Sequence, residues 1–506
     1  MDYILAVDVG TSSLRSIVYD LRGKVICMAQ KEYHSEFKIP SYVEQDPRTW
    51  KEALIITLKN VSDFIRQRKI KISAISVTSQ RASVIPVNDR CEPLDNAIMW
   101  QDKRSFDKCG KIQSMLGEEK VYRKTGLRID PYFSLPKMLW LKEERPDIFN
   151  KAYKLLGVQD FIIYQLTNLF VTDWTQGSRT MLMNIENFSW DEEILKETGI
   201  KSSILCELVP PGSTAGYLTG EMAGLTGLTG GVPVIISGGD QQCAAVALNI
   251  LQPGHAEANT GTGSFIIAYS EKPVFDRKRR TLCSAAAVPG KWVCEAGMFT
   301  TGAIYRWFKE QFFGAENKDK DLYTMLNEEI RDTPLGSGGV LILPHFEGSA
   351  APYWNPLAKG VIFNLTLGTK RADIARAILE GICLELADNL SIIEENVGSI
   401  DEISVAGGLT RFDLFNQMQA DAFNKPVIKY QNDEASSLGA SIVAAVSLGC
   451  YKNYDEAFKN MSQNIQLIFE PEPDNTLKFK ELVRRKNLLY EALNKNGIYD
   501  VFKNNV

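Results

Sequence analysis

The sequence is poor in the residues and patterns on which metal centres, disulfide scaffolds and membrane spans depend. Its 506 residues include only three histidines, and its nine cysteines are scattered, with no C-x-x-C pair and no Cys/His cluster, which argues against a zinc site. An odd cysteine count and the lack of a signal peptide are typical of the reducing cytosol, so we expect a cytoplasmic protein. No stretch approaches about 18 uninterrupted apolar residues, so no transmembrane helix is expected.

A large excess of charge of either sign is absent too. Lys and Arg together number 57, and Asp and Glu 62, which gives a formal net charge of −5. This balance argues against a nucleic-acid partner, although a local nest of backbone N–H groups would still bind phosphate. With 44% apolar and 24% charged residues, the chain has the composition of a soluble globular protein. At 506 residues it is too long for one core, so we expect two large domains.

The most informative stretch lies near the start of the chain. An apolar run at residues 4–7 leads into an Asp-x-Gly-Thr-Ser-Ser segment at 8–13, and a second apolar run follows at 17–19. This order predicts a strand, a tight polar turn and a second strand. Taken alone, the pattern is equally typical of an ordinary hairpin.

The side chains of this turn suit a phosphate group and its metal ion. Gly10 lets the backbone bend where a side chain would clash. Thr11, Ser12 and Ser13 offer hydroxyl and backbone N–H donors that would line phosphate oxygens. Asp8 stands where a carboxylate could hold a water molecule on Mg²⁺.

A second copy of this pattern strengthens the phosphate interpretation. Residues 260–263 read Thr-Gly-Thr-Gly and again precede an apolar, β-branched run, at 265–268. Two similar strand–turn–strand units, one early and one in mid-chain, indicate two related halves. Such halves would present two phosphate loops to one cleft.

Strand-like and helix-like patterns alternate in both halves, which predicts α/β domains. We expect strands at 3–8, 15–20, 24–30, 73–79, 232–237, 264–269, 340–344 and 402–406. We expect helices at 50–65, 133–144, 159–167, 372–397, 412–423, 436–448 and 477–493, the last as a surface cover. The boundary is placed near residue 250, which gives an N-terminal domain at 1–250 and a C-terminal domain at 251–506.

A glycine pair followed by an acidic residue ends the expected strand at 232–237. Because Gly238 and Gly239 remove bulk from the strand end, Asp240 would project into the crevice at the carboxyl edge of the sheet, where open α/β sheets bind ligands. A carboxylate there can accept a proton from an attacking hydroxyl. The alternative is that Asp240 caps the helix that follows.

A second glycine pair, Gly407 and Gly408, follows the expected strand at 402–406. Paired glycines allow a flat ligand such as an adenine ring to approach the backbone. The alternative is a close turn between a strand and a helix.

A separate set of residues suits a sugar-like ligand. Arg81 follows a predicted strand, Trp100 and Asp102 lie further along, and Tyr132 stands in the segment at 130–134. Aromatic rings would cover the C–H face of a sugar, and the charged groups would hold its hydroxyls. Taken singly, each of these residues is more often structural.

Together, and in this order, these stretches resemble the FGGY family of carbohydrate kinases, which have the actin-like, ribonuclease H-like ATPase fold. Residues 132–144 resemble the first signature of the family, and residues 360–380 resemble the second, except that Asn364 stands where a glycine is usual. The resemblance spans nearly the whole chain. It implies an α/β protein of two actin-like domains, with ATP, Mg²⁺ and the substrate in the cleft between them.

The resemblance also implies a role for each candidate residue, and it makes Asp240 the catalytic base rather than a helix cap. The residues that it implies for the acceptor are Arg81, Trp100, Asp102, Tyr132, Asp240, Gln241 and Phe265. Those that it implies for ATP are Gly10, Thr11, Ser12, Arg15, Gly261, Thr262, Gly263, Gly407 and Gly408. Asp8 and Asp240 would hold Mg²⁺ through water.

Within the family, the segments at 178–182, 239–242 and 351–354 are most similar to glycerol kinases. Glycerol kinases have Gln-Arg-Glu where this chain has Gln-Arg-Ala at 80–82, so a carboxylate that grips glycerol hydroxyls is missing. A charge-assisted hydrogen bond of this kind is worth about 1.5–3 kcal/mol, and Asp102 could replace it from another side. We therefore expect phosphorylation of a primary hydroxyl on a larger polyol or a pentulose-type ketose, with glycerol as the alternative acceptor.

A remote alternative of a different class is a catalytically silent regulator that binds sugar and ATP, and a bare ATPase or chaperone of the same superfold is a third. The intact Asp8, Asp240 and two Gly-Thr turns argue against the regulator. The sugar-type residues have no role in a bare ATPase. The expected partner is a small sugar or polyol, with no nucleic acid and no membrane, and the expected assembly is a homodimer or homotetramer.

Overall fold

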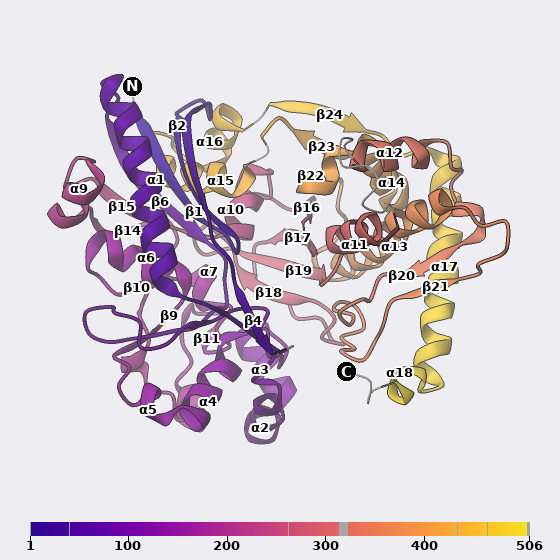
Figure 1. Cartoon of the computed structure of the whole chain (residues 1–506), viewed down its shortest axis with the longest axis horizontal. Helices are drawn as coiled ribbons and strands as arrows, with labels where there is room; N and C mark the ends of the chain where they lie inside the picture. Colours follow the sequence, from indigo (N-terminus) through magenta and orange to yellow (C-terminus); the bar gives the residue numbers. More distant parts are fainter. Residues whose placement is uncertain are drawn as a thin grey trace.

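The computed structural model describes residues 2–39, 41–261, 263–312, 322–432, 434–462 and 464–502. Within these residues the chain folds into two halves, each built on one large β-sheet and covered by helices (Figure 1). The N-terminal half lies on the left of that view and the C-terminal half on the right. The expected α/β architecture is therefore confirmed.

The six strands of the N-terminal sheet stand in the order β14-β15-β6-β1-β2-β3. These strands are β1 (Tyr3–Val9), β2 (Ser13–Asp20), β3 (Val25–Glu32), β6 (Ile72–Ser79), β14 (Ser213–Tyr217) and β15 (Pro233–Gly239). β1, β6 and β15 are parallel neighbours, and the other three pair antiparallel with theirs. All of β1 after its first residue is buried, as is typical of a parallel strand covered on both faces.

The C-terminal sheet repeats this arrangement in the order β18-β19-β17-β16-β22-β23-β24. Its strands are β16 (His255–Thr260), β17 (Ser264–Ser270), β18 (Leu282–Ala285), β19 (Trp292–Met298), β22 (Glu402–Ala406), β23 (Val427–Tyr430) and β24 (Ile465–Phe469). β16, β22 and β23 are the parallel neighbours, and β18 is an added edge strand. The repeat that the two Gly-Thr turns predicted is present.

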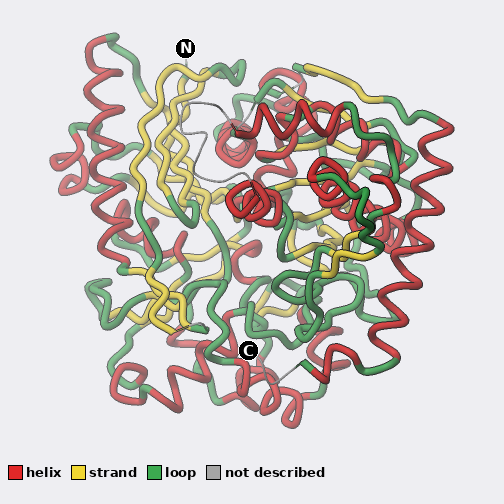
Figure 2. The backbone as a smooth tube through the Cα atoms, turned by 45° about the vertical axis from the view of Figure 1, so that its right-hand side comes forward, coloured by secondary structure: helices red, strands yellow, loops and turns green. Residues whose placement is uncertain are grey.

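A long helix packs against each sheet, and that of the N-terminal half stands at the left in Figure 2. In the N-terminal half this is α1 (Pro47–Gln67), which begins after Asp46, whose side chain accepts a hydrogen bond from the N–H of Arg48 at 2.9 Å. Its buried face includes Trp50, Leu54, Leu58, Val61 and Ile65, so the expected helix at 50–65 is confirmed. α13 (Arg371–Val397) holds the same place in the C-terminal half and packs into the core of that half.

Two helices, α10 (Asp240–Ala247) and α15 (Ala435–Ser447), lie between the sheets (Figure 1). Each follows the last parallel strand of its own half, so together they join the halves. At the point where they cross, a Cβ on Gly439 would lie 1.7 Å from the carbonyl oxygen of Cys243. Only glycine allows the two backbones to approach this closely.

A group of shorter helices lies below the N-terminal sheet in Figure 1. They are α2 (Phe106–Leu116), α3 (Glu118–Thr125), α4 (Ser134–Glu144) and α5 (Pro146–Phe149). They enclose a separate apolar core that includes Ile112, Val121 and Leu139. The helix expected at 133–144 is confirmed as α4, and the one expected at 159–167 as α6 (Val158–Thr167).

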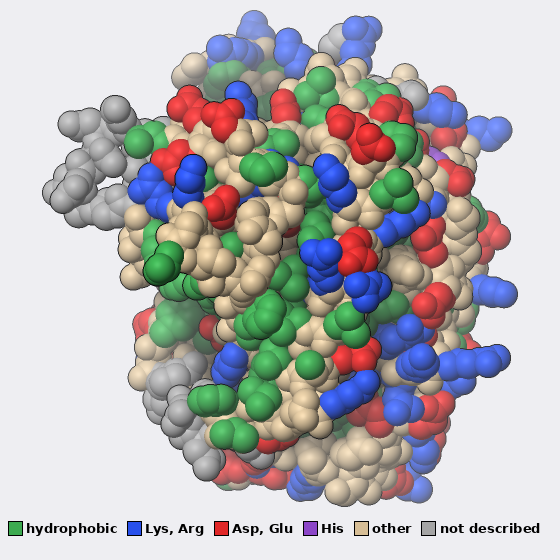
Figure 3. All heavy atoms as spheres, turned by 90° about the vertical axis from the view of Figure 1, so that its right-hand side faces the viewer, with side chains coloured by type: hydrophobic (Ala, Val, Ile, Leu, Met, Phe, Trp, Pro, Cys, Tyr) green, Lys and Arg blue, Asp and Glu red, His purple; other side chains and the backbone are tan. Residues whose placement is uncertain are grey.

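α17 (Pro473–Lys495) runs along the outer side of the C-terminal half, which faces the viewer in Figure 3. It is more than the expected surface cover, because Lys486 is fully buried and its Nζ donates to Oε2 of Glu385 at 2.6 Å. Glu385 also lies 3.1 Å from Nε2 of His345. Neither this helix nor any other in the described part of the chain has the length and apolar character that a membrane span needs.

Candidate active site

The candidate residues converge where the parallel strands of each half end. Asp8 lies next to the end of β1, and Asp240 lies directly after the end of β15. The pKa of Asp8 is raised to about 7, first by burial and then by the Asp240 carboxylate, while Arg15 acts in the opposite direction. The Asp240 carboxylate is therefore close enough to Asp8 for its negative charge to raise the pKa of Asp8.

These two carboxylates fit the outer shell of a magnesium ion. Mg²⁺ keeps several of its waters and usually takes one or two carboxylates together with phosphate oxygens. Among the residues that the structure describes, no three His, Cys, Asp or Glu side chains gather into a metal site. Asp8 and Asp240 are two carboxylates of the kind that could hold waters of such an ion.

The turn between β1 and β2 is fixed by two residues that sequence reasoning missed, Tyr33 and Gln80. The hydroxyl of Tyr33 donates to the carbonyl of Gly10 at 2.7 Å, and Nε2 of Gln80 donates to the same carbonyl at 3.2 Å. The hydroxyl of Thr11 donates to Oε1 of Gln80 at 3.2 Å and accepts from Nε1 of Trp100 at 3.2 Å. The turn predicted to bind phosphate therefore contacts the tryptophan predicted to bind the acceptor.

The turn between β16 and β17 is the counterpart in the C-terminal half. The N–H of Gly261 donates to the carbonyl of Gly263 at 2.9 Å, and the N–H of Gly302 donates to the carbonyl of Gly261 at 3.0 Å. A Cβ at Gly263 would lie 2.7 Å from the carbonyl oxygen of Met298, so a larger residue would displace the chain. Thr262, the predicted phosphate ligand between the two glycines, lies outside the described residues.

A hollow of about 540 Å³ is lined by residues of both halves. Gly407 and Gly408 form part of its wall, just after the end of β22. Gly407 has φ +100°, and a Cβ there would lie 2.4 Å from the carbonyl oxygen of Thr260, so this position requires glycine. Arg15 enters the hollow from the N-terminal half, where its Nη1 lies 2.6 Å from Oε2 of Glu434.

Asp240 is the first residue of α10, whose N-cap is Gly239, so its carboxylate stands at the sheet edge, where its Oδ1 also accepts from the N–H of Gln241 at 2.8 Å. Arg81 packs across the strand end, because a Cβ at Gly239 would lie 2.3 Å from its Cδ. Nη2 of Arg81 donates to Oε1 of Gln241 at 2.8 Å, whereas its Nη1 is buried without a hydrogen-bond partner among the described residues. Burial raises the pKa of Asp240, and the Arg81 guanidinium opposes that rise.

Two further charged residues, Arg179 and Glu295, lie behind this group and were missed by sequence reasoning. Glu295, on β19, forms an ion pair with Arg179 and accepts a hydrogen bond from Nε2 of Gln242 at 3.1 Å. Its Oε2 also lies 3.8 Å from Nη2 of Arg81. A buried carboxylate of the C-terminal half thus orients two arginines of the N-terminal half. The only signal in the sequence was the segment at 178–182, which resembled glycerol kinases without suggesting a role.

Aromatic rings from both halves complete the group. The rings of Trp100 and Tyr132 pack edge to face, with centroids 5.5 Å apart, and the guanidinium of Arg179 lies 6.0 Å from the Tyr132 ring. Phe265, on β17, lines a hollow of about 420 Å³ together with Tyr132 and Arg179. The aromatic cover expected for a sugar-like ligand is therefore assembled between the halves.

Asp102 does not offer a free oxygen to this group. Its side chain is fully buried, and its Oδ2 accepts from the N–H of Val43 at 2.6 Å. Both of its oxygens accept from Nε of Arg104, and Arg104 also donates to Glu44 at 2.8 Å. The expectation that Asp102 binds the acceptor is not supported, because its hydrogen-bonding capacity is used within the fold.

Ala82, where the glycerol kinase pattern has a glutamate, is buried and has φ +68°. It lines a hollow of about 390 Å³ together with Ser83, Gln176 and Thr180. Asp160 lines the same hollow, and burial raises the pKa of its carboxyl to about 7. Ala82, the residue directly after Arg81, therefore borders a small, partly polar hollow.

The remaining predicted residues come from both halves. The N-terminal half contributes Asp8, Gly10, Thr11, Ser12, Arg15, Arg81, Trp100, Tyr132, Asp240 and Gln241, and the C-terminal half contributes Gly261, Gly263, Phe265, Gly407 and Gly408. This arrangement can hold a polyanion on the side of the glycine turns. It can hold a compound with several hydroxyls on the side of the aromatic rings, and it places a carboxylate at Asp240 that can take a proton.

Comparison with protein families gives two matches that together span most of the chain. Residues 3–247 match the N-terminal domain of the FGGY family of carbohydrate kinases. Residues 256–448 match the C-terminal domain of the same family.

Individual relatives agree over nearly their full length. The glycerol kinase of Thermococcus gammatolerans is 33% identical over 497 residues, which cover 96% of this chain and 97% of that protein. A solved structure of ligand-bound xylulose kinase from Lactobacillus acidophilus has a TM-score of 0.90 at 26% identity and covers 97% of this chain and 98% of its own. The structure of Plasmodium falciparum glycerol kinase with ADP has a TM-score of 0.87 at 25% identity, with the same two coverages.

Proposed function

The chain belongs to the FGGY family of carbohydrate kinases, and from this premise we propose that it phosphorylates a terminal primary hydroxyl of a small polyol, with glycerol as the first candidate. Its fold is the two-domain actin-like ATPase fold, and it is an ATP-dependent phosphotransferase that acts on a small sugar or polyol. The observation that carries the proposal is the position of Asp240, which stands at the cleft beside the hydrogen bond between Arg81 and Gln241 and close to Asp8.

In this proposal Asp240 is the catalytic base. Phosphoryl transfer passes through a loose transition state, so the acceptor hydroxyl becomes acidic only as its oxygen bonds to phosphorus. Asp240 would orient that hydroxyl and take its proton late in the step. Because burial raises the pKa of Asp240, its carboxylate accepts a proton more readily than a free aspartate does.

The phosphate side needs alignment and charge neutralisation rather than covalent chemistry. We assign the phosphates to the turns that begin at Gly10 and Gly261, with help from Arg15, and the adenine ring to the wall at Gly407. Mg²⁺, when bound, would neutralise charge on the transferring phosphoryl group. Asp8 would hold waters of that ion, together with Asp240.

On the acceptor side, Arg81 would offer to a hydroxyl group its Nη1, which has no hydrogen-bond partner among the described residues, while Gln241 fixes its Nη2. Trp100 and Tyr132 would cover the C–H face of the acceptor, and Phe265 would close over it from the C-terminal half. Approach of the two halves would exclude water and so limit hydrolysis of ATP.

The relatives support the alternative acceptor better than the acceptor first expected. The sequence alone favoured a pentulose-type ketose, whereas the relative that is 33% identical is named a glycerol kinase and the xylulose kinase structure is 26% identical. We therefore place glycerol first. A pentulose-type ketose stays the second candidate, because Ala82 and the hollow beside it stand where glycerol kinases have a gripping carboxylate.

The test is release of ADP from ATP and Mg²⁺ over a panel of glycerol, erythritol, D-xylulose, pentitols and hexuloses, with Asp240→Asn as the blank. Highest turnover on glycerol supports the first candidate. Strong turnover on D-xylulose with little on glycerol replaces it with the second. ADP release that never depends on an acceptor, or that is equal in Asp240→Asn, contradicts the proposed kinase reaction at this site.

We also propose that the protein is cytoplasmic, has no nucleic-acid or membrane partner, and forms homodimers or homotetramers. The nine free cysteines support a reducing compartment. Three exposed apolar side chains at and after β21 (Val361–Phe363), those of Phe363, Leu365 and Leu367, support self-association. Light scattering of the purified protein tests the assembly, and a monomer at all concentrations contradicts it.

A further inference from the structure

Lys137 is a buried cation whose bonds all go to one short loop. It lies near the start of α4, and its side chain is fully buried. Its Nζ donates to three successive backbone carbonyls, those of Pro131 at 2.6 Å, Tyr132 at 2.6 Å and Phe133 at 3.1 Å. Three carbonyls match the three N–H donors of an ammonium group.

This placement is costly to the fold. A buried ammonium group loses its hydration, and near the N-terminus of a helix it also faces the positive end of the helix dipole. Burial lowers the pKa of Lys137 to about 7, although the carboxylates of Asp102 and Asp130 favour its charged form. The three hydrogen bonds of this buried lysine tie the loop at 131–133 to the first turns of α4.

The loop presents Tyr132 to the cleft, and Tyr132 is held on both sides of its backbone. Its N–H donates to Oδ1 of Asp130 at 2.8 Å, and its carbonyl accepts from Lys137. Its ring packs against Trp100, which in turn donates to the turn between β1 and β2. The residue after this loop, Ser134, starts α4 and donates its N–H to the carbonyl of Arg179 at 3.4 Å.

We propose that Lys137 is a positioning residue for the acceptor, which it serves by fixing the loop of Tyr132 against Trp100 and Arg179. The proposal rests on the assignment of Tyr132 to the acceptor site under the proposed function. It adds a residue that never touches the substrate, and it predicts an effect on acceptor binding that leaves ATP binding alone.

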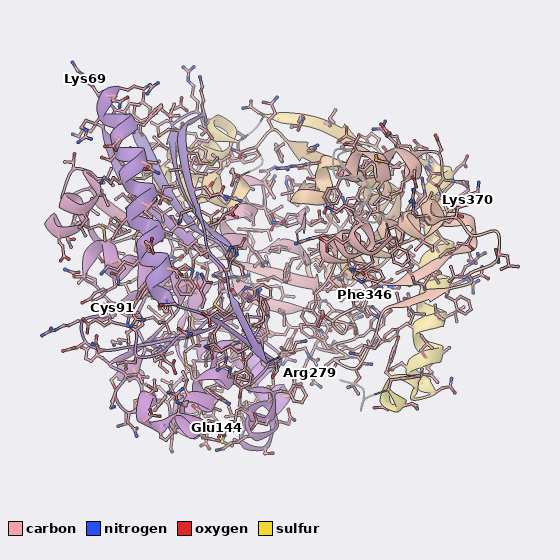
Figure 4. The ribbon with its side chains drawn as sticks, in the orientation of Figure 1. Lys69, Cys91, Glu144, Arg279, Phe346 and Lys370 are labelled. Carbon is pink, nitrogen blue, oxygen red and sulfur yellow. The ribbon has the colours of Figure 1, made fainter. Side chains whose placement is uncertain are left out.

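A matched control lies on the same helix. Lys142 also donates to two backbone carbonyls, those of Thr198 at 3.0 Å and Gly199 at 3.1 Å. These carbonyls belong to the end of α8 (Glu192–Thr198), and Lys142 reaches them from the last turn of α4, near Glu144, which Figure 4 labels at the lower rim of the N-terminal half. Lys142→Met therefore removes a similar lysine from the same helix without touching the loop of Tyr132.

The experiment compares Lys137→Met, Lys142→Met and Tyr132→Ala with the wild-type enzyme. Initial rates give the KM for glycerol, for D-xylulose and for ATP, and hydrogen exchange gives the protection of the amides at 130–133. We expect Lys137→Met to raise the acceptor KM about tenfold or more, because a small misplacement of an orienting group is costly. We expect the KM for ATP to stay within about twofold, and amide protection to fall only at this loop.

The outcomes separate this inference from the proposed function. If Tyr132→Ala raises the acceptor KM and Lys137→Met does not, Tyr132 belongs to the site and the role of Lys137 is overturned. If Tyr132→Ala changes nothing, or the wild type uses neither acceptor, the proposed site fails, while the exchange data still report whether Lys137 holds the loop. Equal effects of Lys137→Met and Lys142→Met also overturn the inference. Should Lys137→Met fail to fold, Asp130→Ala removes the other support of Tyr132 and is expected to raise the same KM.

Discussion

Arg15 of the N-terminal half and Glu434 of the C-terminal half form an ion pair across the cleft, with Nη1 of Arg15 2.6 Å from Oε2 of Glu434. Their side chains are 35% and 25% exposed, so water screens the pair and its net contribution is small. Both residues line the hollow that we assign to the nucleotide. Phosphate groups that enter this hollow would compete with Glu434 for Arg15.

Replacement of Glu434 by glutamine should therefore strengthen nucleotide binding. The change removes a negative charge from the hollow and frees the guanidinium of Arg15. We expect the KM for ATP to fall about two- to fivefold, which corresponds to the up to about 1 kcal/mol of a partly exposed pair. Arg15→Ala is the opposing control and should raise the KM for ATP. A higher KM in Glu434→Gln would show that Glu434 helps to bind the nucleotide instead.

Asp240→Asn should lose activity and keep its fold. Without a carboxylate at the start of α10, the acceptor proton has no base, and the loss expected for general base catalysis is about 10²–10⁴ in kcat. Initial rates and thermal denaturation measure the two properties. Asp455→Asn, on the exposed side of α16 (Tyr454–Met461), serves as the control and should be neutral. Near wild-type turnover in Asp240→Asn would rule out the base assignment.

Asp8→Asn should be more stable than the wild type, and increasingly so as the pH rises. The pKa of Asp8 is raised in the folded protein from 3.8 to about 7, so the folded state binds a proton that the unfolded state has released. The protonated carboxyl of Asp8 therefore makes its full contribution to stability below about pH 4, and this contribution is lost as the pH rises through 7. Asparagine stays neutral at every pH. The difference in the free energy of unfolding between Asp8→Asn and the wild type should therefore widen by about 2–3 kcal/mol between pH 5 and pH 8.

This comparison is made by denaturation with EDTA present and without nucleotide, because a bound cation would stabilise the carboxylate. Asp20→Asn, at the far end of β2, is a control on the neighbouring strand. If the difference in unfolding free energy between Asp8→Asn and the wild type does not change with pH, Asp8 is ionised throughout the range.

Ala82→Glu should raise activity on glycerol. The added carboxylate would stand directly after Arg81, next to the hollow that Ala82 now lines, and could accept hydrogen bonds from glycerol hydroxyls. One charge-assisted hydrogen bond is worth about 1.5–3 kcal/mol, so kcat/KM for glycerol should rise about tenfold or more. Ala82→Gln adds the same bulk without charge and should gain less. If neither variant gains, acceptor preference is decided elsewhere in the cleft.

Lys486→Met should destabilise the C-terminal half without a specific effect on either KM. It removes the cation from a fully buried pair and leaves Glu385 without its main partner. Burial alone would raise the pKa of Glu385, and Lys486, with help from His345, holds that pKa at about 2. Breaking a buried pair on one side costs about 3–5 kcal/mol. Lys495→Met, at the exposed end of the same helix, is the control for thermal denaturation. An unchanged melting temperature in Lys486→Met would mean that α17 contributes little to the fold.

Sequence reasoning worked where the signal is local. The buried face of α1 follows helical spacing, and the glycines at 239 and 407 mark places where backbone or side chains approach too closely for a Cβ. The positions of Asp8 and Asp240 follow in turn, because each stands at the end of a parallel strand. The end of a strand can be predicted from the sequence even when the strands that lie beside it cannot.

The features of the site and fold that could not be predicted depend on interactions between residues that are distant in the chain. Arg179 and Glu295 come from opposite halves, and neither has a pattern of its own. Asp102 was expected to face the acceptor because nothing in the sequence shows that Val43 and Arg104 use its oxygens. The buried Lys486 was read as part of a surface helix for the same reason, since its partner Glu385 lies on α13.

The crossing of α10 and α15 at Gly439 is a place where the backbones of the two halves approach very closely. α10 starts at Asp240, and Cys243, whose carbonyl oxygen leaves no room for a side chain on Gly439, lies in its first turn. A methyl group at Gly439 would act as a wedge placed one helical turn from the proposed base. A residue outside both predicted binding sites thus limits how closely the helix that begins at the proposed base packs against the opposite half.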